Sequence, residues 1–243
     1  MNDDLLRIRD MLIERAKTRL AELPSFLNFT GNKDADALLN DLEEHPHAFV
    51  TACIMDRQMR AEKAWLIPYR LSERLGYFDF PGLARTSLEK LRAAMHNPAP
   101  LHRFPDDMAC YLHLGIQRIG TEYGGNASRI WAGEPPSATI VRRFLEFEGV
   151  GPKIATMAAN ILVREFRIPV SDRYSIDISA DVQVRRVFAR LGFVPENATP
   201  EYLVYRAREL WPEYPGIFDA ALWELGREIC HSRVPLCDTK LHS

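Results

Sequence analysis

Apolar residues recur every three or four positions along most of the chain, which is the spacing that one face of an α-helix produces. Residues 3–23 show it, with apolar positions at Leu5, Ile8, Leu12, Ala16 and Leu20. Helices are also predicted over 34–44, 60–75, 105–119, 126–132, 138–147, 153–166 and 181–191, and 46–56 is predicted as a buried helix that starts after Pro46. Ser87 can cap a further helix that runs through His96. The chain has no sustained period-two alternation and no Asn-Gly hairpin, so we predict an all-α fold.

Three stretches interrupt these helices. The segments 97–105 and 133–137 contain prolines, and 169–180 (PVSDRYSIDISA) is polar and non-periodic. No internal repeat is present, which argues against repeat architectures. We expect two helical subdomains: a bundle over 46–168, and a second formed by 1–45 together with 169–243.

Composition narrows the class of protein. The 243 residues are 47% hydrophobic and 26% charged, with a net charge of −2, which fits an ordinary globular protein without a global preference for nucleic acid. No run of eighteen apolar residues predicts a membrane span, and the charged N-terminus has no signal-peptide core. We therefore expect a cytoplasmic protein whose cysteines are reduced thiols or metal ligands.

The segment EGVGPK, residues 148–153, joins two predicted helices over about 138–166. Gly149 and Gly151 permit positive φ and close backbone approach, and Pro152 suits a first helical turn. Such a turn points the backbone N–H groups of a helix N-terminus outward, where they can bind a phosphate. A plain glycine turn between two packed helices is the alternative.

Lys153 lies in the first turn of the second helix of this hairpin. The positive end of the helix dipole disfavours an ammonium there, so the position suits a lysine that reacts as a neutral amine. A solvated lysine that contacts phosphate is the alternative. Farther along, Asp181 stands at the N-cap of the helix 181–191, and capping alone could explain it. Asp177, in the same loop, competes with Asp181 for any chemical role.

GVGPKIA, followed about thirty residues later by DVQVRRVFARLGF, resembles the helix-hairpin-helix DNA glycosylase superfamily, in its endonuclease III group. The family hairpin reads Gly-Val-Gly-x-Lys-x-Ala. The resemblance places Lys153 on the nucleophilic lysine and Asp181 on the catalytic aspartate. The chain departs from the family at Val182-Gln183, where Thr-His is usual, and at Glu148, where Pro is usual.

Weaker likenesses extend over roughly 46–238 and imply DNA contacts. FVTACIMDRQ resembles the helix that ends in a glutamine inserted into DNA, here Gln58. IGTEYGGNAS resembles the loop that wedges beside the flipped base, with Tyr123 at its tip. The remaining DNA contacts that the resemblance implies are Gly149, Val150, Gly151 and Arg186.

Many members of this family end in four cysteines that hold a 4Fe–4S cluster. Here only Cys230 and Cys237 have the required spacing, and the third position is Lys240. We therefore expect no cofactor, because such a cluster needs four thiolates. A zinc site that adds His231 or His242 is the alternative. Cys53 and Cys110 lie in apolar runs and are expected to be buried thiols.

The resemblance implies a base-excision-repair DNA glycosylase with AP lyase activity, whose active-site cleft lies between two subdomains. The implied partner is double-stranded DNA with a damaged base or an abasic site, at a bacterial or archaeal nucleoid. We expect a monomer that does not bind membranes. A monofunctional glycosylase, in which Asp181 activates water, and a non-catalytic DNA-binding protein stay open as alternatives. The spacing of the residues does not name the lesion.

Overall fold

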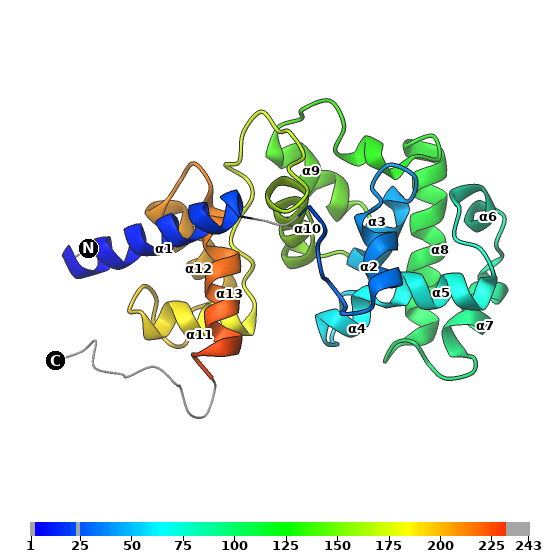
Figure 1. Ribbon diagram of the computed structural model, residues 1–243, viewed down its shortest axis with the longest axis horizontal. Helices are drawn as coiled ribbons and strands as arrows, with labels where there is room; N and C mark the ends of the chain where they lie inside the picture. Colours follow the sequence, from blue (N-terminus) through cyan, green and yellow to red (C-terminus); the bar gives the residue numbers. More distant parts are fainter. Residues whose placement is uncertain (1–2, 23–24, 232–243) are drawn as a thin grey trace. The chain divides into compact units, whose positions relative to one another are not determined.

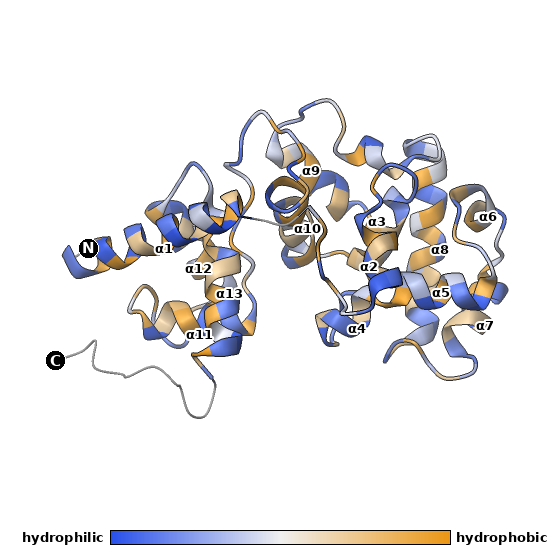
Figure 2. Cartoon of the chain, in the orientation of Figure 1, coloured by the Kyte–Doolittle hydropathy of each residue, from blue (hydrophilic) through white to orange (hydrophobic). Residues whose placement is uncertain are grey.

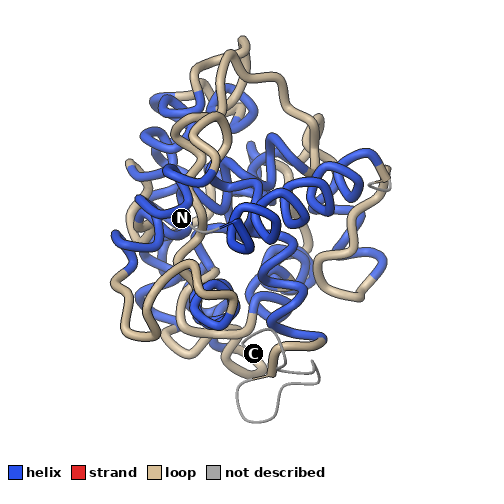
Figure 3. Tube along the Cα trace, turned by 90° about the vertical axis from the view of Figure 1, so that its left-hand side faces the viewer, coloured by secondary structure: helices blue, strands red, loops and turns tan. Residues whose placement is uncertain are grey.

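The computed structural model describes residues 3–22 and 25–231. Every regular element in these residues is a helix, which confirms the predicted all-α class (Figure 3). None of these helices is both long and apolar enough to cross a membrane.

The described residues form two compact units. Of the described residues, the first unit, here called unit 1, contains 3–22, 136–138 and 159–231, and unit 2 contains 25–135 and 139–158. The first and last helices therefore belong to the same unit. The predicted ranges also join the two terminal regions, but they place the borders at 46 and 168.

Unit 2 is built from consecutive short helices (Figure 1). They are α2 (Lys33–Asn40), α3 (Pro46–Met55), α4 (Ala61–Trp65), α5 (Ile67–Leu75), α6 (Phe80–Ala84), α7 (Leu88–His96), α8 (Pro105–Glu122) and the 3-10 helix η1 (Ala127–Ile130). α3 is at its centre, since all ten of its residues are buried. Phe49 of α3 makes edge contacts with the rings of Trp65, Trp131 and Phe144, at centroid distances of 5.6–6.3 Å.

Unit 1 contains α1 (Asp3–Ala21), α11 (Val182–Arg190), α12 (Pro200–Leu210), the 3-10 helix η2 (Pro215–Ile217) and α13 (Phe218–Glu228). α13 packs against both α1 and α11. The core of unit 1 includes Phe188, whose ring lies 5.0 Å from that of Phe193 and 5.8 Å from that of Phe218. Hydrophilic and hydrophobic residues are interspersed along α1 and α11, as the colours of Figure 2 show.

Two helices form the predicted hairpin, α9 (Ser137–Leu145) and α10 (Pro152–Arg164). The border between the units passes through both of them, so the glycine turn and the first half of α10 belong to unit 2.

The structure corrects several predicted elements. The helix expected over 60–75 is two helices, α4 and α5, because Pro68 lacks the N–H that a continuous helix would use. The predicted helix at 126–132 is the 3-10 helix η1. α6, α12 and α13 were not predicted. For α12 a start signal is present, since the Thr199 hydroxyl caps it 3.2 Å from the Tyr202 N–H and Pro200 follows.

Candidate functional site

The turn between α9 and α10 requires glycine at position 149. Gly149 has φ +86°, and a Cβ there would lie 2.7 Å from Cδ2 of Tyr111 on α8. The ring of Tyr111 therefore packs directly on the main chain of the turn. The turn is closed by the Val150 N–H, which donates to the Phe147 carbonyl at 3.0 Å. Val150 itself is buried, so of the three turn residues predicted to contact DNA it offers neither side chain nor amide.

The start of α10 presents unbonded donors. The N–H groups of Gly149, Gly151 and Lys153 have no hydrogen-bond acceptor in the part of the chain that the structure describes. Lys153, the second residue of α10, is exposed. Three amides and one amine at the positive end of a thirteen-residue helix form an arrangement that suits a phosphate.

Arg57 connects this turn to the loop that follows α3. Its guanidinium donates to the Gly149 carbonyl at 3.2 Å and lies 5.7 Å from the centre of the Tyr111 ring. The next residue, Gln58, is exposed and has φ +50°, which is uncommon for a residue with a side chain. The structure therefore brings Gln58 and the glycine turn, two of the predicted DNA contacts, to one region of unit 2.

The loop that holds Gln58 has a second attachment. The Nε2 atom of His102 lies 3.0 Å from the Arg57 carbonyl, and burial lowers the pKa of His102. Arg57 was not among the predicted site residues, although it stands directly before Gln58 in the sequence. Its role follows from a contact 92 residues away.

Asp181 is the N-cap of α11, as predicted. Its Oδ1 atom accepts the N–H groups of Gln183 at 2.8 Å and Val184 at 2.9 Å. Its Oδ2 atom has no partner among the described residues. The side chain is half-buried, so the carboxylate is fixed in place by one oxygen and keeps the other for chemistry.

Asp177, the alternative candidate for a chemical role, forms an ion pair with Arg208. Both of its oxygens accept from Arg208 of α12, at 2.7 Å from Nε and 2.8 Å from Nη2. This bidentate pair raises the pKa of the Arg208 guanidinium. The geometry of unit 1 therefore favours Asp181 over Asp177 for a chemical role.

Two residues predicted to contact DNA lie in other surroundings than expected, and their contacts with DNA stay predictions. Tyr123 does not lie at the tip of a loop: it is the C-cap of α8, it is 7% exposed, and its ring stacks on that of Phe147. Burial is also the main reason why the pKa of Tyr123 is raised. The glycines that follow Tyr123 suggested a loop tip, but the Tyr123 ring is buried because it packs on Phe147.

Arg186 is used inside unit 1. Its Nε atom donates to the Cys230 carbonyl at 2.8 Å, and its Nη2 atom donates to the Gly226 carbonyl at 2.7 Å and to the Gln183 side chain. Arg186 therefore holds α11 against the end of α13. Sequence spacing does not reveal which acceptors a guanidinium meets, and the DNA contact of Arg186 stays a prediction.

Lys153 belongs to unit 2 and Asp181 to unit 1, and the cleft between them stays a prediction. Cys230 is a buried free thiol, Cys53 is buried, and Cys110 is half-buried rather than buried. Cys237 and His242, two of the ligands considered for a zinc site, lie outside the described residues. Within residues 3–22 and 25–231 no cluster of three or more metal-ligating side chains occurs.

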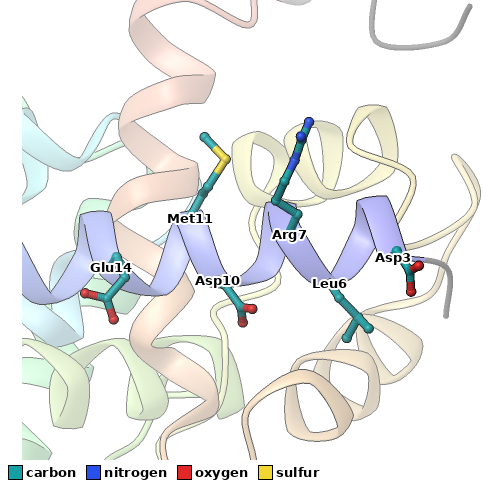
Figure 4. Close-up of a pocket in the computed structure, with 6 residues that line it drawn as sticks. All are labelled: Asp3, Leu6, Arg7, Asp10, Met11 and Glu14. Carbon is teal, nitrogen blue, oxygen red and sulfur yellow. The ribbon is translucent and has the colours of Figure 1, made fainter.

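An open depression on the surface is found on α1, lined by Asp3, Leu6, Arg7, Asp10, Met11 and Glu14 (Figure 4). All of its lining comes from one helix, and Arg7 and Met11 project from a different side of that helix than Leu6. None of the predicted site residues borders it. We therefore place the candidate site at the hairpin and at Asp181.

No family model and no curated protein sequence matches the chain. Solved structures do match it. Endonuclease III, in a trapped covalent intermediate with DNA, matches with a TM-score of 0.63 at 18% identity, over 98% of this chain and 92% of that one. A thermostable thymine-DNA glycosylase matches with a TM-score of 0.58 at 16% identity, over 97% and 92% of the two chains.

A third match is the 8-oxoguanine DNA glycosylase of Methanocaldococcus jannaschii, with a TM-score of 0.52 at 17% identity over 89% of this chain and 94% of that one. The chain has the fold of the helix-hairpin-helix DNA glycosylases. The expected resemblance is confirmed at the level of the fold. Identities of 16–18% do not carry an activity, so the activity is argued from the site.

Proposed function

We propose that this protein is a base-excision-repair DNA glycosylase that also cleaves the strand at the abasic site it produces. One observation carries the proposal. On a glycosylase fold, an exposed lysine follows a tight glycine turn, and a capping aspartate keeps one carboxylate oxygen unbonded. Endonuclease III, which has this fold, is known as a covalent intermediate with DNA, and such an intermediate requires a nucleophile.

DNA would be gripped at the hairpin. The amides of Gly149, Gly151 and Lys153 would bind a backbone phosphate, assisted by the dipole of α10. Gln58, held near the turn by its neighbour Arg57, would enter the space that the flipped base leaves. These contacts position the duplex and do not select a lesion.

The chemistry would begin when the neutral amine of Lys153 attacks C1′ of the sugar. The glycosidic bond breaks, and its electron pair leaves with the base, which takes up a proton. The sugar ring then opens to a Schiff base between C1′ and the lysine nitrogen. Loss of a C2′ proton expels the 3′ phosphate by β-elimination and cleaves the strand. Asp181 would stabilise the positive charge that develops on the sugar, or accept a proton from the lysine.

Borohydride trapping tests this proposal. The protein is mixed with duplex DNA that carries one abasic site, reduced, and run on a denaturing gel. We expect a covalent adduct with the wild-type protein and none with Lys153→Gln. Lys33→Gln is the matched control, because Lys33 is an exposed lysine in the first turn of α2 in the same unit.

Three other outcomes separate the alternatives. An adduct that survives in Lys153→Gln would mean that another amine is the nucleophile. On a second set of duplexes, each with one damaged base in place of the abasic site, base release without any adduct that is abolished in Asp181→Asn would indicate a monofunctional glycosylase in which Asp181 activates water. DNA binding without base release or adduct formation would indicate a non-catalytic binding protein.

A further inference from the structure

Unit 1 contains a buried polar cluster that the proposed chemistry does not use. Its members are Asn160 of α10, Ser179 of the loop before Asp181, Tyr214 directly before η2, and Asp219 of α13. All four are at most 7% exposed. Buried polar groups are costly unless they are hydrogen-bonded, so the pairing within the cluster shows what it holds in place.

Asp219 is the centre of this cluster. Its Oδ1 atom accepts the backbone N–H of Ser179 at 2.8 Å, and its Oδ2 atom accepts from Nδ2 of Asn160 at 3.2 Å. Asn160 is fixed in turn, since its Nδ2 also donates to the Gly216 carbonyl at 2.9 Å and its Oδ1 accepts the Tyr214 hydroxyl. The carboxylate therefore cannot shift without breaking several buried hydrogen bonds.

The peptide that Asp219 holds leads directly to Asp181. The Ser179 carbonyl accepts the backbone N–H of Asp181 at 2.7 Å, and the Asp181 side chain then caps α11. Earlier in the loop, Ile176 and Ile178 are buried, and the Ile176 carbonyl accepts the Gly216 N–H at 2.7 Å. The segment is thus attached along its length, and its last attachment before Asp181 is the Ser179–Asp219 hydrogen bond.

We propose that Asp219 is a positioning residue for Asp181: it holds the Ser179 peptide and thereby sets how the Asp181 carboxylate is presented. This inference rests on the proposed function, in which Asp181 acts on the sugar or the lysine. Asp219 itself does not reach substrate, since it is buried beneath the loop that it holds.

The charge on Asp219 decides how strongly its carboxyl group binds the Ser179 peptide. Burial, together with the Asp181 carboxylate, raises the pKa of Asp219 to about 7, against the opposing effect of Arg164 and of the hydrogen bonds from Ser179 and Asn160. The neighbouring Tyr214 stays neutral, because burial raises its pKa to about 12. Arg164 supplies positive charge nearby: its Nη1 atom is buried without a partner, while its other nitrogens pair with Glu165.

Ionised Asp219 accepts both hydrogen bonds with a full negative charge, and such bonds are stronger than neutral ones. Protonation weakens them. The Ser179 peptide should therefore be held more firmly above pH 7 than below it.

An NMR titration tests the positioning contact without any substrate. The amide ¹⁵N and ¹H shifts of Ser179 and Asp181 are followed from pH 5.5 to 8.5. We expect both amides to show a step centred near pH 7 in the wild type and no such step in Asp219→Asn. Asp36→Asn is the matched control, because Asp36 is a buried aspartate of unit 2 that holds the amides of Phe29 and Thr30.

The step should persist in Asp36→Asn. Its absence in the wild type, or its persistence in Asp219→Asn, would overturn the proposal. The wild-type titration needs no variant, so the test stands even if Asp219→Asn folds poorly.

Borohydride trapping on duplex DNA with an abasic site then tests whether the Ser179–Asp219 contact affects the rate of adduct formation. At saturating DNA we expect Asp219→Asn to form the adduct on the order of 10- to 100-fold more slowly, because a small displacement of a reacting group has effects of this size. The affinity for DNA should stay within about twofold. Asp219→Asn that traps at the wild-type rate across the pH range would refute the positioning role.

The two proposals fail separately. If the wild type forms no adduct, the lyase assignment fails while the NMR titration still reads the Ser179–Asp219 contact. If the wild type traps and the titration shows no step, the lyase assignment stands and Asp219 is not the positioning residue.

Discussion

The glycine turn of unit 2 is held by an aromatic ring and a permanently charged guanidinium, from Tyr111 and Arg57. The segment that presents Asp181 in unit 1 is held instead by a buried carboxyl group whose pKa is about 7. The packing of a ring on a glycine involves no charge, and guanidinium groups stay protonated in proteins. The comparison predicts that the proposed DNA grip of the turn is insensitive to pH near neutrality, whereas the placement of Asp181, the proposed catalytic aspartate, is sensitive to it.

The largest effect is expected when Asp181 is replaced, and the same replacement at Asp177 should have little effect on adduct formation. Asp181→Asn should slow adduct formation on the order of 10²- to 10³-fold, because it removes the negative charge that faces the reaction. Its free energy of unfolding should change little, since asparagine is an equally good N-cap. Trapping rates and urea unfolding measure the two quantities.

Asp177→Asn serves as the counterpart. It breaks the ion pair with the partly exposed Arg208, so it should cost about 1 kcal/mol of stability or less and leave the trapping rate nearly unchanged. The reverse pattern, with Asp177→Asn inactive and Asp181→Asn active, would transfer the catalytic role to Asp177.

The second prediction concerns stability against pH. The pKa of Asp219 is raised in the folded protein from 3.8 to about 7, so its stabilising contribution is present below pH 3.8 and is lost as pH rises through 7. Between pH 5 and pH 8 the wild type should lose about 2–3 kcal/mol of stability relative to Asp219→Asn, which cannot ionise there. Urea unfolding of both proteins at several pH values gives this difference, and a constant difference would refute it.

The third prediction concerns the turn itself. Gly149→Ala places a Cβ 2.7 Å from the Tyr111 ring at φ +86°, so it should cost about 2–3 kcal/mol of stability. Gly151→Ala is the matched control: nothing lies within 4 Å of its Cβ position and its φ is not positive, so its cost should be below about 1 kcal/mol. Equal unfolding midpoints for the two variants would show that Tyr111 yields easily.

The smallest effect is expected at Arg57. Arg57→Met keeps much of the packing but removes the donor to the Gly149 carbonyl, so it should cost about 1 kcal/mol and weaken DNA binding severalfold. Arg60→Met removes the same charge from an exposed residue three positions later and is the control. Fluorescence anisotropy with a labelled abasic duplex should show a larger loss for Arg57→Met. Equal losses would mean that only the charge matters.

Local signals predicted much of the fold and part of the site. Periodicity located α1, α9, α10 and α11, because their apolar faces recur within one element, and α3 was predicted as a buried apolar run after Pro46. Where two local signals conflicted, as at Pro68, the backbone chemistry of proline overruled the periodicity and divided one predicted helix into two. Asp181 was found as a cap because an N-cap is defined by the residues next to it.

By itself, then, the sequence determined the helical class, the glycine turn and the places of Lys153 and Asp181 along the chain, since each depends on neighbours a few residues away. Tertiary structure decided what surrounds them. It buried Tyr123, turned Arg186 inward, committed Asp177 to Arg208, and brought Asp219 to a peptide 40 residues away. A buried polar side chain is paired with whatever partner the packing brings near, and partners so far apart leave no spacing in the sequence by which to find them.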